Sequence, residues 1–173
     1  MLGNAVWNTG SNGTNGYTSS SNGLTKNFYT YERSANNGKI CSSGTSCNDT
    51  VERATTWIGK IGLMYPSDYG YATSGGSTTD RATCLNKELY NWDSSSVSDC
   101  KNNDWLFNNN YQWTLSPRAD SSSATNAFRF SSGGYVFTDT AYDGYGVRPV
   151  GYLLPSVGVQ SGDGSSGNPF ILS

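Results

Sequence analysis

The sequence predicts an α+β protein, because helix-like patterns lie in its first part and strand-like patterns fill its second part. Asp49 or Thr50 is a suitable helix N-cap, and a helix is predicted from there to Gly59. Residues 84 to 92 (CLNKELYNW) predict a second helix, and residues 103 to 109 (NDWLFNN) a third, short helical turn. The fold class follows from this order of elements.

Strands are predicted wherever short apolar runs alternate with polar residues and end at turn formers. One is expected from Ile61 to Tyr65, where Pro66 stops it. The strands of the second half are predicted at residues 113–116 (WTLS), 126–130 (NAFRF), 134–138 (GYVFT) and 146–154 (GVRPVGYLL). The first fifty residues, rich in Asn, Gly and Ser, are predicted as loops and short strands and not as a helix.

Length and charge limit the kinds of partner. A chain of 173 residues and 18.6 kDa without a visible linker or repeat predicts one domain over residues 1–173. Residues 1–56 form its N-terminal strands and loops, and residues 57–172 its main module. Only 14% of residues are charged, the net charge is -2 and the 11 Lys and Arg are scattered, which argues against a nucleic-acid partner. The sequence contains no run of about 18 apolar residues, so direct membrane insertion is not predicted.

Histidine is absent, which removes the most common general base near neutral pH and the most common transition-metal ligand. The four cysteines form two locally spaced pairs, Cys41 with Cys47 and Cys84 with Cys100. An even count in a chain rich in Gly, Ser and Asn favours disulfides in an oxidising compartment over a zinc site, whose usual spacings are missing. We therefore expect a secreted or surface-displayed protein, with any signal or anchoring segment outside this sequence.

Residues 133–150 (GGYVFTDTAYDGYGVRPV) combine aromatic rings with Gly, Thr and Asp, a composition typical of binding surfaces. Tyr135 and Phe137 fall on one face of a strand and Val136 on the other. Val136 and Ala141 are expected to be buried. The alternative is that the rings pack beneath loops inside a small core. A separate scaffold of buried side chains is expected at Trp113, Leu115, Val147 and Val150.

Several motifs occur in the order seen in one known family. They are WTLSP (113–117), Ala127, Gly133 with Gly134, GVRPV (146–150) and SGDGSSGNPFIL (161–172), together with MYPSDYGYA (64–72) and CKNNDWLF (100–107). Over residues 57–172 the chain resembles secreted bacterial and phage proteins with the C-type-lectin-like fold, in its formylglycine-generating-enzyme variant. The resemblance implies that fold, with early helices and a strand-rich, loop-rich C-terminal half.

Residues 120–145 also resemble the variable region of proteins diversified by retroelements, in which Asn codons are randomised just before a G-[FV]-R-P strand. The resemblance implies a ligand-contact surface in this segment. The contact residues expected there are Asp120, Ser122, Ser123, Thr125, Asn126, Phe128, Arg129, Tyr135, Phe137, Asp139, Tyr142, Asp143 and Tyr145.

The sequence predicts a binding protein and not an enzyme. The enzyme that names the fold variant uses a cysteine pair. Here no cysteine follows Cys100, and both local pairs fall in loop-like stretches before the matching C-terminal strands, so that pair cannot be carried over to this chain. The loop around Asp163 lacks the carboxylate spacing of a calcium site and is expected to be a turn before the last strand. Arg148 is expected to form a structural ion pair or to donate to a carbonyl group. No cofactor and no metal are predicted.

The expected function is therefore adhesin-like binding of a protein or glycan receptor on another cell. The alternative is a structural packing module of a bacterial surface appendage or a phage tail fibre. In that case the aromatic segment is buried in a subunit interface.

Overall fold

The computed structural model describes residues 1–173 except 9–16, 19, 21, 33–55, 119–124 and 166. The helical elements are α1 (Thr25–Glu32), α2 (Pro66–Tyr71), α3 (Arg81–Leu85), α4 (Ser98–Asn102) and the 3₁₀ turns η1 (Leu89–Asn91) and η2 (Ser95–Val97). The strands are β1 (Ala5–Asn8), β2 (Thr56–Gly59), β3 (Ile61–Leu63), β4 (Gln112–Pro117), β5 (Asn126–Phe130), β6 (Val136–Thr140), β7 (Pro149–Gly151), β8 (Val159–Ser161) and β9 (Ile171–Leu172). These elements confirm the mixed α+β class.

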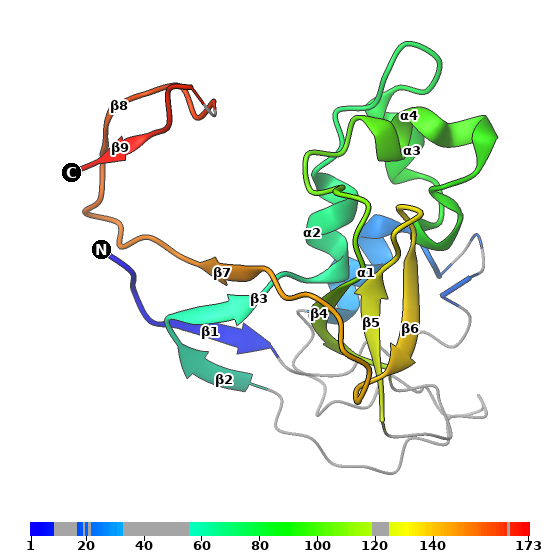
Figure 1. Cartoon of the computed structure of the whole chain (residues 1–173), viewed down its shortest axis with the longest axis horizontal. Helices are drawn as coiled ribbons and strands as arrows, with labels where there is room; N and C mark the ends of the chain where they lie inside the picture. The colour runs from blue at the N-terminus through cyan, green and yellow to red at the C-terminus, as the bar shows by residue number, and fades with distance from the viewer. Residues whose placement is uncertain (9–16, 19, 21, 33–55, 119–124, 166) are drawn as a thin grey trace.

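The three-stranded sheet β4-β5-β6 organises the fold (Figure 1). Its strands are antiparallel, with Arg129 opposite Trp113 on β4 and opposite Phe137 on β6. Helix α2 packs against β4 and β5, and α1 packs against α2. Three further antiparallel pairs, β1-β2, β3-β7 and β8-β9, lie outside this sheet. The sheet therefore has one face covered by helices.

Aromatic rings make up much of the core beneath the sheet. Phe128 is fully buried, and its ring meets those of Phe28 and Tyr17 edge to face, at centroid distances of 5.3 and 5.1 Å. Tyr69 of α2 lies 4.6 Å from Phe130 of β5, between ring centroids. Such pairs add to the stabilisation that burial alone gives. They fix α1 and α2 onto the inner face of β5.

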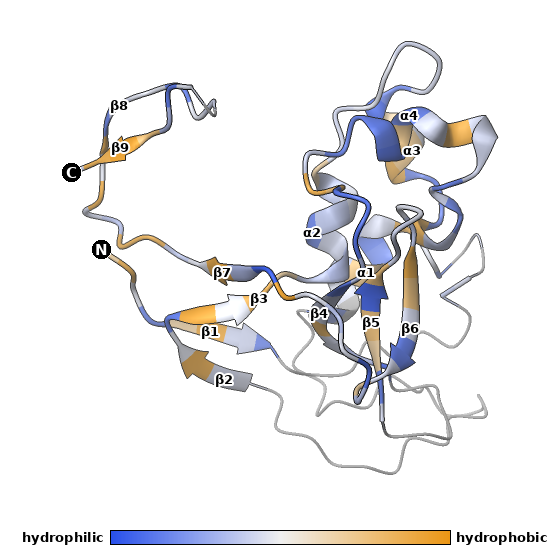
Figure 2. Ribbon diagram, in the orientation of Figure 1, coloured by the Kyte–Doolittle hydropathy of each residue, from blue (hydrophilic) through white to orange (hydrophobic). Residues whose placement is uncertain are grey.

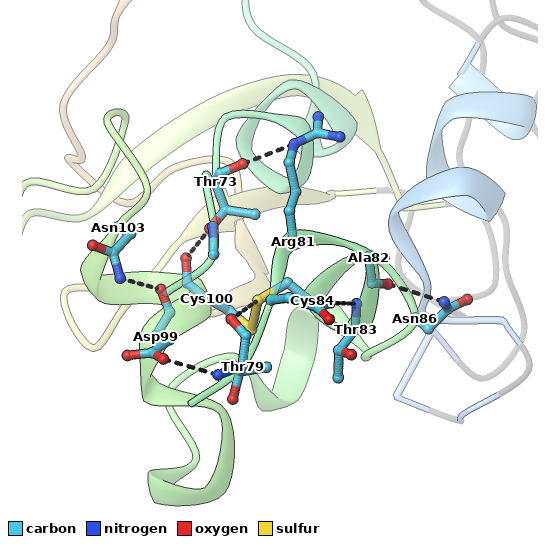
Figure 3. The surroundings of a disulfide bond; sticks show 12 residues. Thr73, Thr79, Arg81, Ala82, Thr83, Cys84, Asn86, Asp99, Cys100 and Asn103 are labelled. Atoms are coloured by element: carbon cyan, nitrogen blue, oxygen red, sulfur yellow. Dashed lines mark hydrogen bonds between the residues drawn. A yellow bond between two sulfur atoms is a disulfide. The ribbon is translucent and has the colours of Figure 1, made fainter. Parts of the chain in front are cut away.

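A disulfide between Cys84 and Cys100 joins α3 to α4, and both residues are fully buried (Figure 3). The Asp99 carboxylate accepts hydrogen bonds from the backbone N–H groups of Thr78 and Thr79, at 2.7 and 2.9 Å. The Thr78 hydroxyl group also donates to this carboxylate (2.7 Å), and that bond, followed by the two backbone bonds, lowers the pKa of Asp99. The predicted Cys84–Cys100 pairing is confirmed, whereas Cys41 and Cys47 lie outside the described residues.

The first and last parts of the chain lie side by side. Gly3 N–H donates to Tyr152 C=O (3.0 Å), and Leu154 N–H donates to Met1 C=O (2.9 Å). The β8-β9 hairpin projects away from the main sheet on the side where both termini lie (Figure 1). Residues 162–170 connect its strands, and Asp163 accepts from Ser165 N–H (2.9 Å). The expected turn before the last strand is confirmed.

Two helix predictions are corrected. The helix predicted to end at Gly59 is wrong over its described part, because Thr56–Gly59 is strand β2, paired with β1. The first fifty residues do contain a helix, α1, whose Phe28 and Glu32 are buried. Ser67 donates to the Glu32 carboxylate through its N–H (3.0 Å) and its hydroxyl group. Contacts distant in sequence thus stabilise a segment whose local pattern does not predict a helix.

The remaining differences concern extent and burial. Residues 84–92 divide into the end of α3 and η1, and strand 146–154 shortens to β7. Val147 is 61% exposed because pairing with β3 begins only at Pro149, so its predicted burial is wrong. Ala141 is also exposed, since it follows the last residue of β6. Trp113, Leu115 and Val150 are half-buried.

Candidate functional site

The two faces of β5 and β6 carry different chemistry. Phe128, Phe130 and Val136 point to the helices and are buried. Because strand side chains alternate, Arg129, Phe137 and Asp139 share the opposite, outer face. The predicted separation of Val136 from its neighbours Tyr135 and Phe137 is confirmed.

Arg129 is the centre of this outer face. Its Nε and Nη2 atoms both donate to Asp139 Oδ2, each at 3.2 Å. The guanidinium group lies 4.7 Å from the ring centroid of Tyr111, 5.3 Å from that of Tyr145 and 5.4 Å from that of Phe137. Only 7% of Arg129 is exposed. We call these five residues the Arg129 cluster.

Tyr145 completes the cluster from the loop after β6. Its hydroxyl group donates to Asp139 Oδ2 at 2.9 Å, and this bond raises the pKa of Tyr145. Partial burial raises the pKa of Asp139, but hydrogen bonds from Tyr145, Thr140 N–H and Arg129 outweigh it and hold that pKa below its ordinary value. At neutral pH Asp139 is therefore an anion that binds a neutral phenol and a buried cation.

Tyr111 lies at the outer side of the cluster. Its ring stacks on Tyr145 with centroids 5.2 Å apart and an interplanar angle of 27°. Trp113 lies 5.0 Å from Tyr145 and donates through Nε1 to Asp143 C=O at 3.2 Å. Tyr111 is 42% exposed. The Tyr111 ring thus reaches solvent while Tyr145 and the buried Arg129 guanidinium hold it in place.

A second group of rings adjoins the cluster at Phe137. The Tyr90 ring lies 5.9 Å from Phe137 and 6.0 Å from Tyr135, and Tyr17 lies 6.4 Å from Phe137. The turn before β6 places Tyr135 here, and Gly134 in that turn has φ +90°, a conformation that favours glycine. Tyr135 and Phe137 are half-buried. The two rings are therefore only partly in solvent, and Phe137 also packs against the core.

The structure brings together four of the predicted contact residues, which are Arg129, Phe137, Asp139 and Tyr145. Tyr142 stands apart on the loop after β6 and is 83% exposed. Thr125 is exposed and Asn126 is half-buried.

Other predicted contact residues have different surroundings. Asp143 is half-buried and accepts from the Thr140 hydroxyl group at 2.8 Å. Phe128 belongs to the core and not to the surface, because it is fully buried. Asp120, Ser122 and Ser123 lie outside the described residues.

A cavity of about 490 Å³ adjoins the exposed side of Tyr111. Its wall consists of Asn108, Asn110 to Gln112 and residues 144 to 149, and we call it the amide pocket. Trp113 N–H donates to Gly146 C=O (2.9 Å), and Gly146 N–H donates to Tyr111 C=O (3.1 Å). These bonds hold the two walls together. Sequence reasoning missed the pocket, although the run NNNYQ is a signal of amide groups beside a ring.

A second cavity, of about 580 Å³, lies on the other side of Arg148 and is lined by Met64, Tyr71 and Trp105 among others. Arg148 lines both cavities and donates through Nη1 to Leu106 C=O at 3.0 Å, which confirms its predicted role as a carbonyl donor. Asp104 is buried nearby. Burial raises its pKa to about 7, although Leu106 N–H and the charge of Arg148 act in the opposite direction.

Within the described ranges, no group of three or more His, Cys, Asp or Glu side chains is arranged to hold a metal ion. In the same part of the chain, no helix has the length and apolar character needed to cross a bilayer. Comparison of the chain with models of known protein families, with curated proteins and with solved structures finds no match.

Proposed function

We propose that this protein is a non-enzymatic binding module of the adhesin type, which contacts a protein or glycan receptor on another cell. Its contact surface comprises the Arg129 cluster, Trp113, Tyr135 and the exposed loop at Tyr142. The observation that carries the proposal is the exposed Tyr111 ring, which stacks on Tyr145 and contacts the buried Arg129 guanidinium of the Arg129–Asp139 ion pair.

The construction of this surface supports binding. Tyrosine gives a large contact area with few rotatable bonds, so that little side-chain entropy is lost when a partner arrives. The ion pair and the Tyr145–Asp139 hydrogen bond restrict the rings further before any partner is present. Rings held in this way are typical of the few residues that dominate binding energy.

The proposal also includes the fold variant, the diversification of the surface and the location of the protein. The module has the C-type-lectin-like fold of the formylglycine-generating-enzyme variant, and residues 120–145 form a surface diversified by a retroelement. It is secreted or displayed on a cell or phage surface. The buried Cys84–Cys100 disulfide supports an oxidising compartment. A neighbouring reverse-transcriptase gene with an Asn-rich near-copy of residues 113–150 is the expected genetic context.

One observation favours a second candidate, the structural module of an appendage or tail fibre. Apolar side chains are exposed on the peripheral strand pairs, away from the Arg129 cluster; they include Val6, Trp57, Ile58, Ile61, Leu153, Leu154, Phe170 and Ile171. Figure 2 shows the apolar character of β2, β7 and β9 in this region. Exposed apolar groups of this kind mark contact surfaces. In this candidate a second subunit covers them.

Cell binding by matched variants tests the proposal. Fluorescently labelled protein is incubated with intact bacterial cells and with cultured epithelial cells. The variant Tyr111→Ser/Tyr142→Ser removes two exposed rings of the contact surface and should reduce binding at least tenfold. Trp105→Ser is the control, because Trp105 is 77% exposed but lies outside that surface. The proposal would be contradicted if the unmodified protein bound neither cell type, or if both variants lost cell binding equally.

Sedimentation separates the two candidates. A binding module stays monomeric at micromolar concentration. Trp105→Ser keeps the melting temperature of the unmodified protein within about 2 °C, since surface substitutions change stability little. Tyr111→Ser/Tyr142→Ser also loses the stack on Tyr145 and the contact with Arg129, so its melting temperature falls by several degrees while the protein stays folded. The structural module instead gives an oligomer at the same concentration. In that case Ile58→Asp shifts the distribution towards monomer, whereas Tyr111→Ser/Tyr142→Ser does not.

A further inference from the structure

We propose that the amide pocket binds a neutral saccharide directly through amide groups and an aromatic ring, without calcium. The inference rests on the proposed binding function and names the ligand class of one part of that surface. The pocket volume of about 490 Å³ is within the usual range for small-molecule sites.

The amide groups of the pocket have unused hydrogen-bonding capacity. Asn108 Oδ1 accepts from Gln112 Nε2 (2.5 Å) and from Asn110 N–H (3.2 Å), and Asn110 Nδ2 donates to Asn108 C=O (3.1 Å). None of these bonds uses Asn108 Nδ2 or Asn110 Oδ1. The internal bonds hold the amides in place and leave one donor group and one acceptor group for a ligand.

Gln112 anchors this group of amides by donating to Asn108 Oδ1. The residue is only 5% exposed, and its Oε1 atom has no hydrogen-bond partner among the residues that the structure describes. Because this oxygen is shielded from solvent, the polar contacts of a ligand fall to the exposed amide groups of Asn108 and Asn110. A hydroxyl group both donates and accepts, and several adjacent hydroxyl groups match this mixture of amide donors and acceptors. This pattern is the chemistry of a sugar.

The ring of Tyr111 supplies the apolar part of the site. One side of it stacks on Tyr145, and the residue is 42% exposed at the pocket. A pyranose has C–H groups on its faces and hydroxyl groups at its edge. Its face therefore packs on the tyrosine ring while its edge meets the amides.

Other ligand classes fit the pocket less well. Arg148 is the one charged residue in the wall, and its Nη1 already donates to Leu106 C=O, so a multiply charged phosphate is poorly matched. The wall contains no carboxylate, which calcium coordination requires. The three amides disfavour a lipid chain, because their polar groups would lose water without gaining hydrogen bonds.

Saturation-transfer NMR in 5 mM EDTA tests the inference with N-acetylchitotriose, maltotriose, mannotriose and lactose as probes. We expect transfer from aromatic protons to at least one probe. The dissociation constant should rise at least tenfold in Asn110→Ala and in Tyr111→Ala, and less than twofold in Tyr111→Phe and in the control Trp105→Ala, because Trp105 is exposed and lies outside the contact surface and the amide pocket. Thermal melts verify that each variant is folded. Transfer to no probe, transfer only after calcium is added, or equal affinity in all variants would overturn the inference.

Cell binding distinguishes failure of this inference from failure of the proposed function. Cells are treated either with periodate, which cleaves the vicinal diols of sugars, or with trypsin. A saccharide ligand predicts loss of binding after periodate and loss with Asn110→Ala. If binding survives periodate treatment and the Asn110→Ala substitution but is abolished in Tyr111→Ser/Tyr142→Ser, the surface binds a protein and the saccharide inference is wrong. If the unmodified protein binds no cell, the proposed function itself is wrong.

Discussion

The Arg129–Asp139 ion pair should respond asymmetrically to removal of its two members. The variant Asp139→Asn leaves a guanidinium group in a site where Arg129 is 93% buried, and the variant Arg129→Met leaves a carboxylate whose side chain is 32% exposed. Water stabilises the exposed carboxylate but cannot reach the buried cation. Asp139→Asn should therefore be the more destabilising change.

The magnitudes follow from burial and contacts. Removing one member of a fully buried pair costs about 3 to 5 kcal/mol, and partial exposure of Asp139 reduces this to about 2 to 3 kcal/mol. In Arg129→Met, three ring contacts of about 0.5 to 1 kcal/mol each are lost. The buried Nη1, which has no hydrogen-bond partner among the described residues, no longer requires desolvation. We expect Arg129→Met to change stability by less than about 1 kcal/mol.

Urea unfolding and thermal melts at pH 7 give the free energy of unfolding and the melting temperature of both variants and of the double variant Arg129→Met/Asp139→Asn. For a chain of this length the melting temperature should fall by roughly 4 to 12 °C in Asp139→Asn. The double variant should recover most of that loss. Because the pKa of Asp139 is lowered in the folded state, its contribution is present above about pH 4 and is lost as pH falls further. If Arg129→Met were the more destabilising variant, the assignment of Arg129 as the buried partner would be wrong.

Three further predictions concern the scaffold. Phe128→Ala should lower the free energy of unfolding in urea by about 3 to 5 kcal/mol, because the residue is fully buried. A loss below about 1 kcal/mol would mean that Phe128 is a surface residue and not part of the core. The variant Cys84→Ala/Cys100→Ala should lose about 3 kcal/mol on the chain-entropy model for a separation of 16 residues; free thiols at these positions in the native protein, detected by alkylation and mass spectrometry, would contradict the pairing. Burial raises the pKa of Asp104 to about 7, so its carboxyl group favours the folded state fully below pH 4 and loses this contribution as pH rises to about 7. Asp104→Asn should remove that pH dependence, and an unchanged profile would disprove it.

Local pattern was sufficient to predict the central sheet. The alternation at Tyr135, Val136 and Phe137 identifies the faces of β6, and residues 126–130 match β5. It was insufficient for α1, because the helix depends on buried contacts of Phe28 and Glu32 with residues far along the chain. Such contacts have no signature in a short window of sequence.

The candidate site was predictable only in part, for the same reason. The contact segment was placed from its composition, which cannot show that Arg129 is covered by aromatic rings on the outer face and pairs with Asp139 ten residues later. Nor does composition separate the exposed Tyr142 from the buried Phe128. Tyr111 was missed because it lies before the segment and meets it through contacts distant in sequence, with the Arg129 guanidinium and the Tyr145 ring. The apolar appearance of GVRPV likewise suggested burial for Val147, which is exposed.

The Arg129 cluster determines how this surface can be engineered or evolved. Asp139 receives hydrogen bonds from Arg129 and Tyr145, so a library that randomises all of residues 120–145 would discard most of its members through misfolding. Fixing those three positions and Phe128 keeps the frame intact. Codon diversity is then best placed at Thr125 and Tyr142, where exposed side chains permit it. The number of functional variants therefore depends less on how many positions are varied than on which ones are held constant.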